Sequence, residues 1–289
     1  MPSPLRRSPP ALRILVPPAP ASEGLPPCPS SPPPSTASRC ATTSPGTGRR
    51  WCCCTARCSP VRSGGDSAIS GRSPPSTPCS GWTCAATAAP GSPTTPAAYT
   101  QEVLVQDLLA VLEAEDIGRA ALMGYSLGAR IALSTTLAYP GLVTRLVSLG
   151  GSASAQRGAV DSVFFPGVID AVREQGMESF CAGQGLGPEV TSRRARATRT
   201  AFLAADHEAV AARPAAPHAT AAVPDEMLES CTVPALWMAG SEDHPRHEES
   251  ARAASLMPDA EFVSLPGRDH GGTLFPPDEV LAEVMPFLS

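Results

Sequence analysis

The sequence contains neither lysine nor asparagine, so all 22 of its basic residues are arginines. The codons for both missing amino acids are rich in A, which indicates a very GC-rich gene. Long apolar runs are also missing, which excludes a membrane-spanning helix. The apolar stretch that follows Arg6 and Arg7 is too short for an export signal and ends at Pro17 and Pro18. We therefore expect a cytoplasmic protein.

Acidic residues are almost absent from residues 1–97, which contain only Glu23 and Asp66 beside nine arginines. This stretch has a net charge of +7, whereas the rest of the chain carries −12. It also holds 21 of the 34 prolines and 8 of the 10 cysteines, and it lacks a periodic apolar pattern that could build a sheet core. We therefore expect residues 1–97 to be an irregular, low-complexity segment, and residues 98–289 to form the globular part.

From residue 98 the pattern changes to alternating helices and buried strands. Apolar residues from Glu102 to Asp116 share one helical stripe, and the short apolar run RAALMG that follows is typical of a buried strand. A helix stopped by Pro140 and a second strand over Val143–Gly151 come next. Further strands are expected within Cys231–Gly240 and Ala260–Gly267. Helices are expected around 248–256 and over 281–288, so the fold class is α/β with a mostly parallel sheet.

The pentapeptide GYSLG, from Gly124 to Gly128, lies between a predicted strand and a predicted helix. Gly-x-Ser-x-Gly in that setting is a nucleophile elbow, in which a tight turn holds the serine in a strained backbone conformation. Side chains at the two glycines would collide with the neighbouring strand and helix. The turn exposes the Ser126 hydroxyl and places the Leu127 N–H at a helix N-terminus, where it can bind an oxyanion.

A serine nucleophile needs a base that is itself oriented by a third group, and this elbow is expected in the order serine, acid, histidine. Asp243 follows the strand that ends at Gly240, and His270 follows the next strand. Both therefore fall at the same sheet edge as Ser126. Several other residues are interpreted as solvated or surface groups, and Glu242 is an alternative acid that is placed less well. These solvated or surface groups are Asp269, His244 and His247, while His207 and His218 lie in the alanine-rich cap and have no spacing that suggests a metal site.

The segments GYSLGAR, GSEDH and LPGRDHGG resemble the α/β-hydrolase family, from about Tyr99 to the C-terminus. The resemblance implies an α/β-hydrolase sheet with flanking helices and a small helical cap inserted at about residues 152–230. It implies that Ser126 is the nucleophile, His270 the general base and acid, and Asp243 the orienting carboxylate, with Leu127 as one oxyanion donor. It implies no metal and no organic cofactor.

The implied function is hydrolysis of a carboxylic ester, thioester or lactone through an acyl-serine intermediate. Two alternatives stay open: carbon–carbon bond hydrolysis or lyase chemistry with the same triad, and a non-catalytic remnant or binding module. The expected partner is a small acyl substrate, with neither nucleic acid nor membrane, and the oligomeric state is left open. Within the cap, Phe164, Phe165, Ile169 and Met177 either line an apolar pocket or form core, and Arg193, Arg194 and Arg196 either attract an anion or form a solvated face.

Two family motifs are missing from residues 1–97: a strand that ends in His-Gly and supplies the second oxyanion N–H, and a strand that ends in Asp-x-Arg-Gly-x-Gly. Regrouping the codons of WCCCTA from the last base of the Trp51 codon gives Val-Leu-Leu followed by codons that permit His-Gly. The same shift at Trp82 gives Asp, followed by codons that permit Leu-Arg-Gly-His-Gly-Arg. We therefore predict that much of residues 1–97 is a frame-shifted reading of a hydrolase gene, with the frame restored between about Ala89 and Tyr99.

Other interpretations of the cysteine-rich stretch are weaker. The segment contains no histidine, and its cysteines lack paired zinc-ligand spacing. A disulfide framework would need an oxidising compartment, and an arginine-rich nucleic-acid arm would need interleaved aromatic residues. A frame shift would remove two strands beside the elbow strand and one oxyanion donor. The chain as written is therefore expected to fold poorly and to be nearly inactive.

Overall fold

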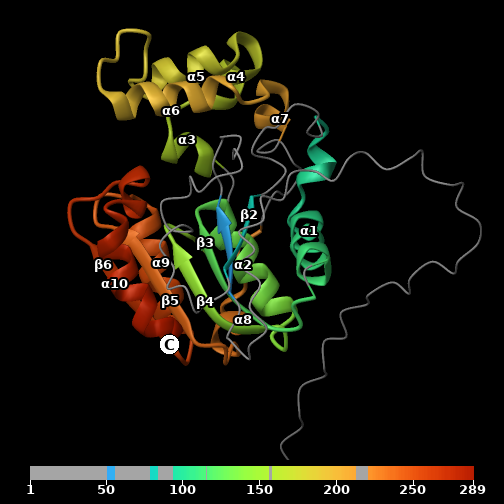
Figure 1. Ribbon diagram of the computed structural model, residues 1–289. Helices are drawn as coiled ribbons and strands as arrows, with labels where there is room; N and C mark the ends of the chain where they lie inside the picture. The colour runs from blue at the N-terminus through green and yellow to red at the C-terminus, as the bar shows by residue number, and fades with distance from the viewer. Residues whose placement is uncertain (1–50, 56–78, 84–93, 115, 156–157, 213–220) are drawn as a thin grey trace, which may run out of the picture. The chain divides into compact units, whose positions relative to one another are not determined.

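The computed structural model describes residues 51–55, 79–83, 94–114, 116–155, 158–212 and 221–289. Within these ranges the chain forms a six-stranded sheet in the order β2-β1-β3-β4-β5-β6 (Figure 1). Every neighbouring pair is parallel, so the carboxyl ends of the strands meet at one edge of the sheet. The strands are β1 Trp51–Thr55, β2 Cys79–Thr83, β3 Ala120–Tyr125, β4 Val143–Leu149, β5 Ala235–Gly240 and β6 Ala260–Leu265.

The expectation that residues 1–97 contribute no strand is wrong at two places, β1 and β2. In the register of β1 with β3, Thr55 lies opposite Tyr125, and β2 pairs with the other side of β1. β1 and β2 thus occupy the two sheet positions next to the elbow strand β3, for which no strand was predicted from the sequence. A strand ladder is made by backbone groups, and Trp and Thr favour extended structure, so the pairing does not require a normal hydrolase sequence.

The helix predicted before the elbow strand is confirmed as α1, Gln101–Ala114, preceded by the short helix η2, Pro96–Tyr99. Leu104, Leu108 and Leu112 lie on its buried face at helical spacing, whereas Val103, which was expected on the apolar stripe, is 38 % exposed. β3 follows with all six residues buried, as the apolar run predicts. α2, Leu127–Ala138, then starts directly at the elbow and ends before Pro140.

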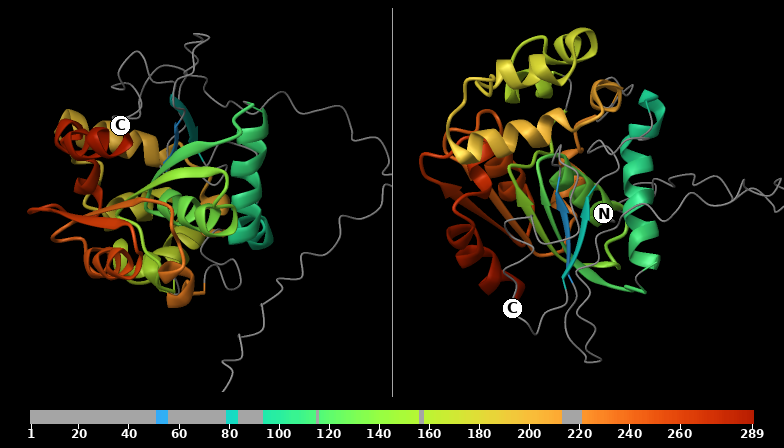
Figure 2. Two further views of the ribbon diagram at one scale, coloured as in Figure 1. Left: turned by 90° about the horizontal axis from the view of Figure 1, so that it is seen from below. Right: turned by 45° about the horizontal axis from the view of Figure 1, so that its top comes forward.

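Two apolar clusters cover the two faces of the sheet, and Figure 2 shows helices on both sides. One cluster joins α1, α2 and α9 (Arg246–Leu256) to residues such as Leu122, Leu146 and Trp237. The other joins α10 (Pro277–Leu288) to the opposite faces of the same strands, through residues such as Met123 and Met238. β3, β5 and most of β4 are buried from both sides, which explains their nearly continuous apolar sequences, whereas the edge strand β6 is mostly half-buried or exposed.

Helices follow β4 in the region predicted to be the cap, which we call the insertion (residues 152–230). They are α3 Ala159–Val163, α4 Val168–Gln175, α5 Met177–Gly183, α6 Arg193–Leu203, α7 His207–Ala212 and α8 Asp225–Glu229. Residues between Val160 and Ala211 form an apolar cluster of their own, in which Met177 is 5 % exposed. Leu228 of α8 instead joins the cluster under the sheet, so the insertion returns to the core before α8.

The C-terminal helix is longer than the sequence analysis expected. α10 begins at Pro277 rather than at Leu281, and Asp278 and Glu279 lie in its first turn. Proline suits the first helical position because its missing N–H has no acceptor there, and acidic residues favour the positive end of the helix dipole. The other predicted elements, α9 and β6, lie where the pattern placed them.

Candidate active site

The elbow has the strained geometry that its sequence predicts. Ser126 has φ 54° and ψ −116°, in a region that side-chain-bearing residues rarely occupy, and it stands between the end of β3 and the start of α2. Its N–H donates to the Leu149 carbonyl at 2.9 Å, which fixes the turn to β4. A Cβ atom at Gly124 would overlap the Gly128 carbonyl, so the first glycine allows the start of the helix to approach the strand.

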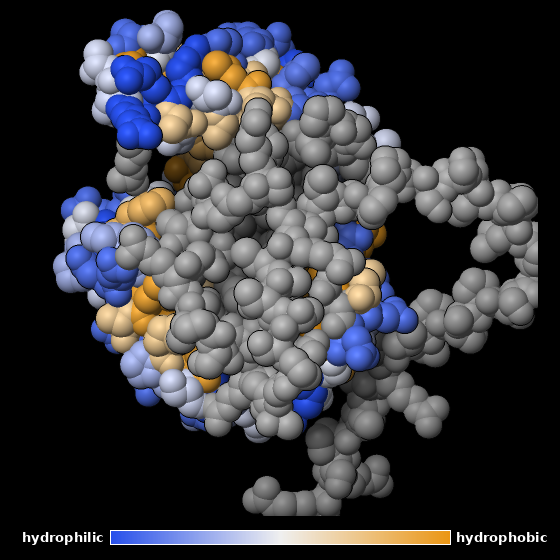
Figure 3. All heavy atoms as spheres, viewed as in Figure 1, coloured by the Kyte–Doolittle hydropathy of each residue, from blue (hydrophilic) through white to orange (hydrophobic). Residues whose placement is uncertain are grey.

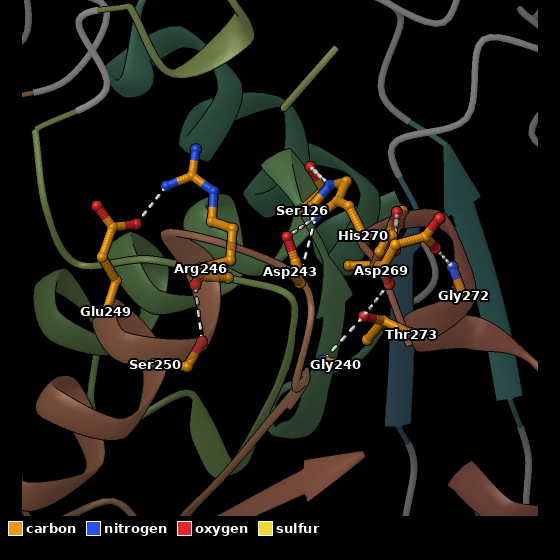
Figure 4. Close-up of polar contacts among 12 residues, drawn as sticks. Ser126, Gly240, Asp243, Arg246, Glu249, Ser250, Asp269, His270, Gly272 and Thr273 are labelled. Carbon is orange, nitrogen blue, oxygen red and sulfur yellow. Dashed lines mark hydrogen bonds and ion pairs between the residues drawn. The ribbon is translucent and has the colours of Figure 1, made fainter. Parts of the chain in front are cut away.

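Ser126, His270 and Asp243 form one hydrogen-bonded chain (Figure 4). The Oγ of Ser126 lies 3.0 Å from Nε2 of His270, and Nδ1 of His270 lies 3.0 and 2.9 Å from the two carboxylate oxygens of Asp243. The side chains of His270 and Asp243 are 13 % and 2 % exposed. Three residues separated by 117 and 27 positions in the sequence are therefore brought together as the sequence predicts.

The hydrogen bonds determine which atoms of Ser126, His270 and Asp243 carry protons. An ionised carboxylate only accepts, so Nδ1 of His270 carries a hydrogen and donates it to Asp243. The other ring nitrogen of a neutral imidazole is then an acceptor, and the Ser126 hydroxyl donates to it. This arrangement can take the proton of Ser126 and can hold the resulting imidazolium against a buried carboxylate.

Backbone contacts lock the histidine loop to the acid loop. The Arg268 carbonyl accepts from the Glu242 N–H at 3.0 Å, and a Cβ at Gly240 would overlap the same carbonyl. Thr273, fully buried in the short helix η3 (Gly271–Leu274), accepts from the Gly240 N–H and donates to the Asp269 carbonyl. The distance between His270 and Asp243 is therefore set by a rigid pair of loops. No sequence motif points to Thr273.

Two further residues touch the histidine and were not identified from the sequence. The Tyr125 hydroxyl donates to the His270 carbonyl at 2.8 Å, and the two rings lie 5.0 Å apart between centroids. Gly150 has φ 54°, and a Cβ there would lie 3.2 Å from Oδ2 of Asp243 and 3.3 Å from Cε1 of His270. The position of Tyr125 directly before the nucleophile could have marked it as a site residue. The position of Gly150 at the end of a predicted strand could have marked it in the same way.

The alternative acid and histidines lie away from this chain of hydrogen bonds. Glu242 is exposed, whereas Asp243 is buried. His244 pairs with Glu248 on the surface, and His247 contacts Ser264. His207 is exposed, and Asp269 is exposed but accepts from the Gly272 N–H at 2.6 Å, while His218 lies outside the described residues.

Leu127 is the first residue of α2, where a backbone N–H has no acceptor within the helix. Its amide is thus available to an oxyanion formed next to Ser126, at the positive end of the helix dipole. β1 ends at Thr55, beside Tyr125. The residues that follow Thr55, from which the family motif would supply a second donor, lie outside the described residues.

Among the described residues, no group of three or more His, Cys, Asp or Glu side chains is arranged to hold a metal ion. No helix in this part of the chain is long and apolar enough to cross a membrane.

In the view of Figure 3 the helices of the insertion present mostly hydrophilic residues with a few apolar ones. Arg193 and Arg196 are exposed, and Phe164 is 37 % exposed.

Comparison with known proteins gives the class of this fold and site. The model of the alpha/beta hydrolase family matches residues 34–283. The match covers most of the chain, and it spans both strands of the N-terminal segment as well as the elbow, the acid and the histidine. The chain belongs to the alpha/beta hydrolase family.

Solved structures of hydrolases share this fold. A structure from a study of carboxylesterases of the thaumarchaeon Nitrososphaera gargenis has a TM-score of 0.67 at 18 % identity, covering 84 % of this chain and 90 % of that one. The enol-lactonase from Burkholderia xenovorans LB400 has a TM-score of 0.67 at 18 % identity, covering 84 % and 92 %. The esterase RhEst1 from Rhodococcus sp. ECU1013 has a TM-score of 0.66 at 18 % identity, covering 83 % and 90 %. No curated protein sequence matches the chain.

Proposed function

We propose that the protein is a serine hydrolase that cleaves a carboxylic ester, thioester or lactone through an acyl-Ser126 intermediate. The observation that carries the proposal is the continuous hydrogen-bonded chain from Ser126 through His270 to the buried Asp243. An esterase and a lactonase among proteins of the same fold support the choice of bond.

In the first half of the reaction, the Oγ of Ser126 attacks the carbonyl carbon of the substrate while its proton passes to Nε2 of His270. The carbonyl oxygen becomes an oxyanion, which the Leu127 N–H stabilises at the N-terminus of α2. His270 then gives the proton to the leaving alcohol or thiol, and the carbon–oxygen or carbon–sulfur bond breaks. The acyl group stays on Ser126.

In the second half, water attacks the acyl carbon and gives its proton to Nε2 of His270. The bond to Ser126 breaks, and His270 returns the proton to the serine oxygen as the acid leaves. Asp243 keeps the imidazole in the required tautomer throughout and stabilises its charged form. The residues described here and one water molecule complete the reaction, so the proposal involves neither metal nor organic cofactor.

The test is to trap the acyl-enzyme on the full chain. The protein is mixed with 4-nitrophenyl acetate, quenched in acid and digested, and the peptides are analysed by mass spectrometry. The expected result is an acetyl group on the peptide that contains Ser126, together with release of nitrophenol at a rate about 10²–10³ below that of the frame-corrected chain. In His270→Ala, neither the acetyl group on Ser126 nor released nitrophenol should be detectable in the first minutes after mixing.

Two variants with a serine replaced serve as a matched pair. Ser126→Ala should lose acylation and turnover, whereas Ser255→Ala should retain both, because Ser255 is exposed on α9 and donates to the nearby Arg252 carbonyl. Turnover that persists in Ser126→Ala would refute the assignment. Acylation at Ser126 without turnover of any ester, thioester or lactone would favour the carbon–carbon bond alternative.

A further inference from the structure

Arg130 lies one helical turn after the nucleophile on α2, and its side chain is almost fully enclosed, with the residue 4 % exposed. Its Nη1 donates to the carbonyls of Ser152 at 2.9 Å and Ser154 at 3.3 Å. Its Nη2 donates to the Ala221 carbonyl. A single guanidinium therefore contacts two stretches of chain that are far apart in the sequence.

These stretches are the two ends of the insertion. We call Ser152–Ser154 the entry stem, where the chain leaves the sheet, and Ala221–Val223 the exit stem, where it returns. The stems also bond to each other, since the Val223 N–H donates to the Ala153 carbonyl at 2.8 Å. The entry stem starts two residues after Gly150, the residue that lies against His270 and Asp243.

The Arg130 charge is costly in this place. Burial lowers the pKa of the Arg130 guanidinium to about 10, with a further lowering by the positive Arg246 that is opposed by Glu249. Its hydrogen-bond acceptors among the described residues are backbone carbonyls, and its Nε has no partner there. A buried cation that binds only carbonyls is poorly compensated, so holding the two stems is the evident contribution of this side chain.

We propose that Arg130 is a positioning residue that ties both stems of the insertion to the helix carrying the nucleophile, and so sets where the insertion stands relative to Ser126. The planar fork of a guanidinium can bond several carbonyls at fixed angles, whereas a lysine ammonium is a compact point charge on a flexible stem. The inference about stem positioning stands independently of the reaction. Its consequence for substrate selection rests on the proposed function.

The direct test is amide hydrogen exchange on the full chain, comparing Arg130→Lys and Arg130→Gln with the unmodified protein. Lysine keeps the charge but not the planar fork, and glutamine keeps neither, so exchange of the Val223 amide should accelerate roughly 10- to 100-fold in both variants. The amides of Ser126 and Gly150, which bond to Leu149 and Met238, should keep their rates. Arg173→Gln, at an exposed arginine paired with Asp170 within the insertion, is the matched control and should change neither set.

Three outcomes overturn the proposal. The first is an unchanged Val223 amide in both Arg130 variants, and the second is equal acceleration of the stem and elbow amides, which would mean general destabilisation. If Arg130→Lys matches the unmodified protein while Arg130→Gln does not, charge rather than fork geometry holds the stems, and the proposal fails as stated.

The second measurement concerns substrate selection. The ratio of kcat/KM for an octanoyl ester to that for an acetyl ester should change by about tenfold in Arg130→Lys, because a displaced insertion alters contacts with the longer acyl chain more than with the short one. An unchanged ratio beside a faster Val223 amide would contradict the link to substrate selection. If the unmodified protein turns over neither ester, the proposed function fails, while the exchange experiment still decides the role of Arg130.

Discussion

The hydroxyl of Tyr125 donates to the carbonyl oxygen of His270 at 2.8 Å, across 145 positions of sequence. The residue directly before the nucleophile thus holds the backbone of the base. The end of β3 therefore carries both Ser126 and a support for the loop that brings His270 to it.

Replacing Tyr125 by Phe removes this hydrogen bond and leaves the His270 carbonyl without its donor. Loss of a hydrogen bond of this kind destabilises the observed position of the His270 loop by roughly 1–2 kcal/mol. We therefore expect kcat for 4-nitrophenyl acetate to fall by about tenfold. Tyr139→Phe is the control, because Tyr139 accepts a hydrogen bond from Gln106 at an exposed site. Equal kcat values for the two variants would show that Tyr125 does not position His270.

Gly150 has a close counterpart in Gly158, which permits a clean comparison. Both have positive φ, 54° and 71°, so an alanine at either is strained by roughly 1–2 kcal/mol. A Cβ at Gly150 would touch Asp243 and His270, whereas a Cβ at Gly158 would meet nothing within 4 Å. We expect similar losses of thermal stability but a large loss of kcat only in Gly150→Ala. A matching loss of kcat in Gly158→Ala would contradict the account.

Two buried cysteines report on whether the core forms in this chain. Cys181 and Cys231 are free and buried, and burial raises the pKa of both thiols. The thiolate is the reactive form, so both should resist iodoacetamide at pH 8 and react once the protein is unfolded in guanidinium. Peptide mass spectrometry measures the two sites separately. Rapid alkylation of Cys231 without denaturant would mean that the cluster beneath the sheet is not formed.

The frame-shift prediction has a molecular counterpart in the sheet. β1 begins at Trp51 and β2 contains Trp82, the two tryptophans at which a shifted reading encodes the missing family motifs. A frame shift was expected to remove these two strands, so their presence in the sheet counts against a shifted reading. Resequencing codons 1–100 should reveal a missing or extra base, and an unchanged sequence from independent templates would refute the prediction.

The frame-corrected chain provides a functional check on the same prediction. Correction would restore the motif that supplies the second oxyanion donor, and one such donor is worth about 10²–10³ in turnover. We therefore expect kcat for 4-nitrophenyl acetate to rise by that factor. Equal kcat values for the two chains would show that the segment as written already supplies what the reaction needs.

Much of the core and the candidate site could be predicted because the signals are local. The elbow pentapeptide, the apolar strands before Asp243 and His270, and the stripe of α1 each lie within a few residues. The roles of Tyr125, Arg130 and Thr273 could not be predicted, since each depends on a contact between distant segments. β1 and β2 were missed because WCCCT and CSGWT contain none of the Val, Ile, Leu or Met side chains that mark the strands β3, β4 and β5.

The central claim is that Ser126 is activated by His270 in this chain. The most direct test is to treat the full chain with a fluorophosphonate probe and to locate the label by mass spectrometry. We predict a single label on Ser126 that disappears in Ser126→Ala and His270→Ala and is retained in Ser255→Ala. Absence of the label in a chain whose Cys231 remains protected would contradict the claim, because the core would then be formed without a reactive serine.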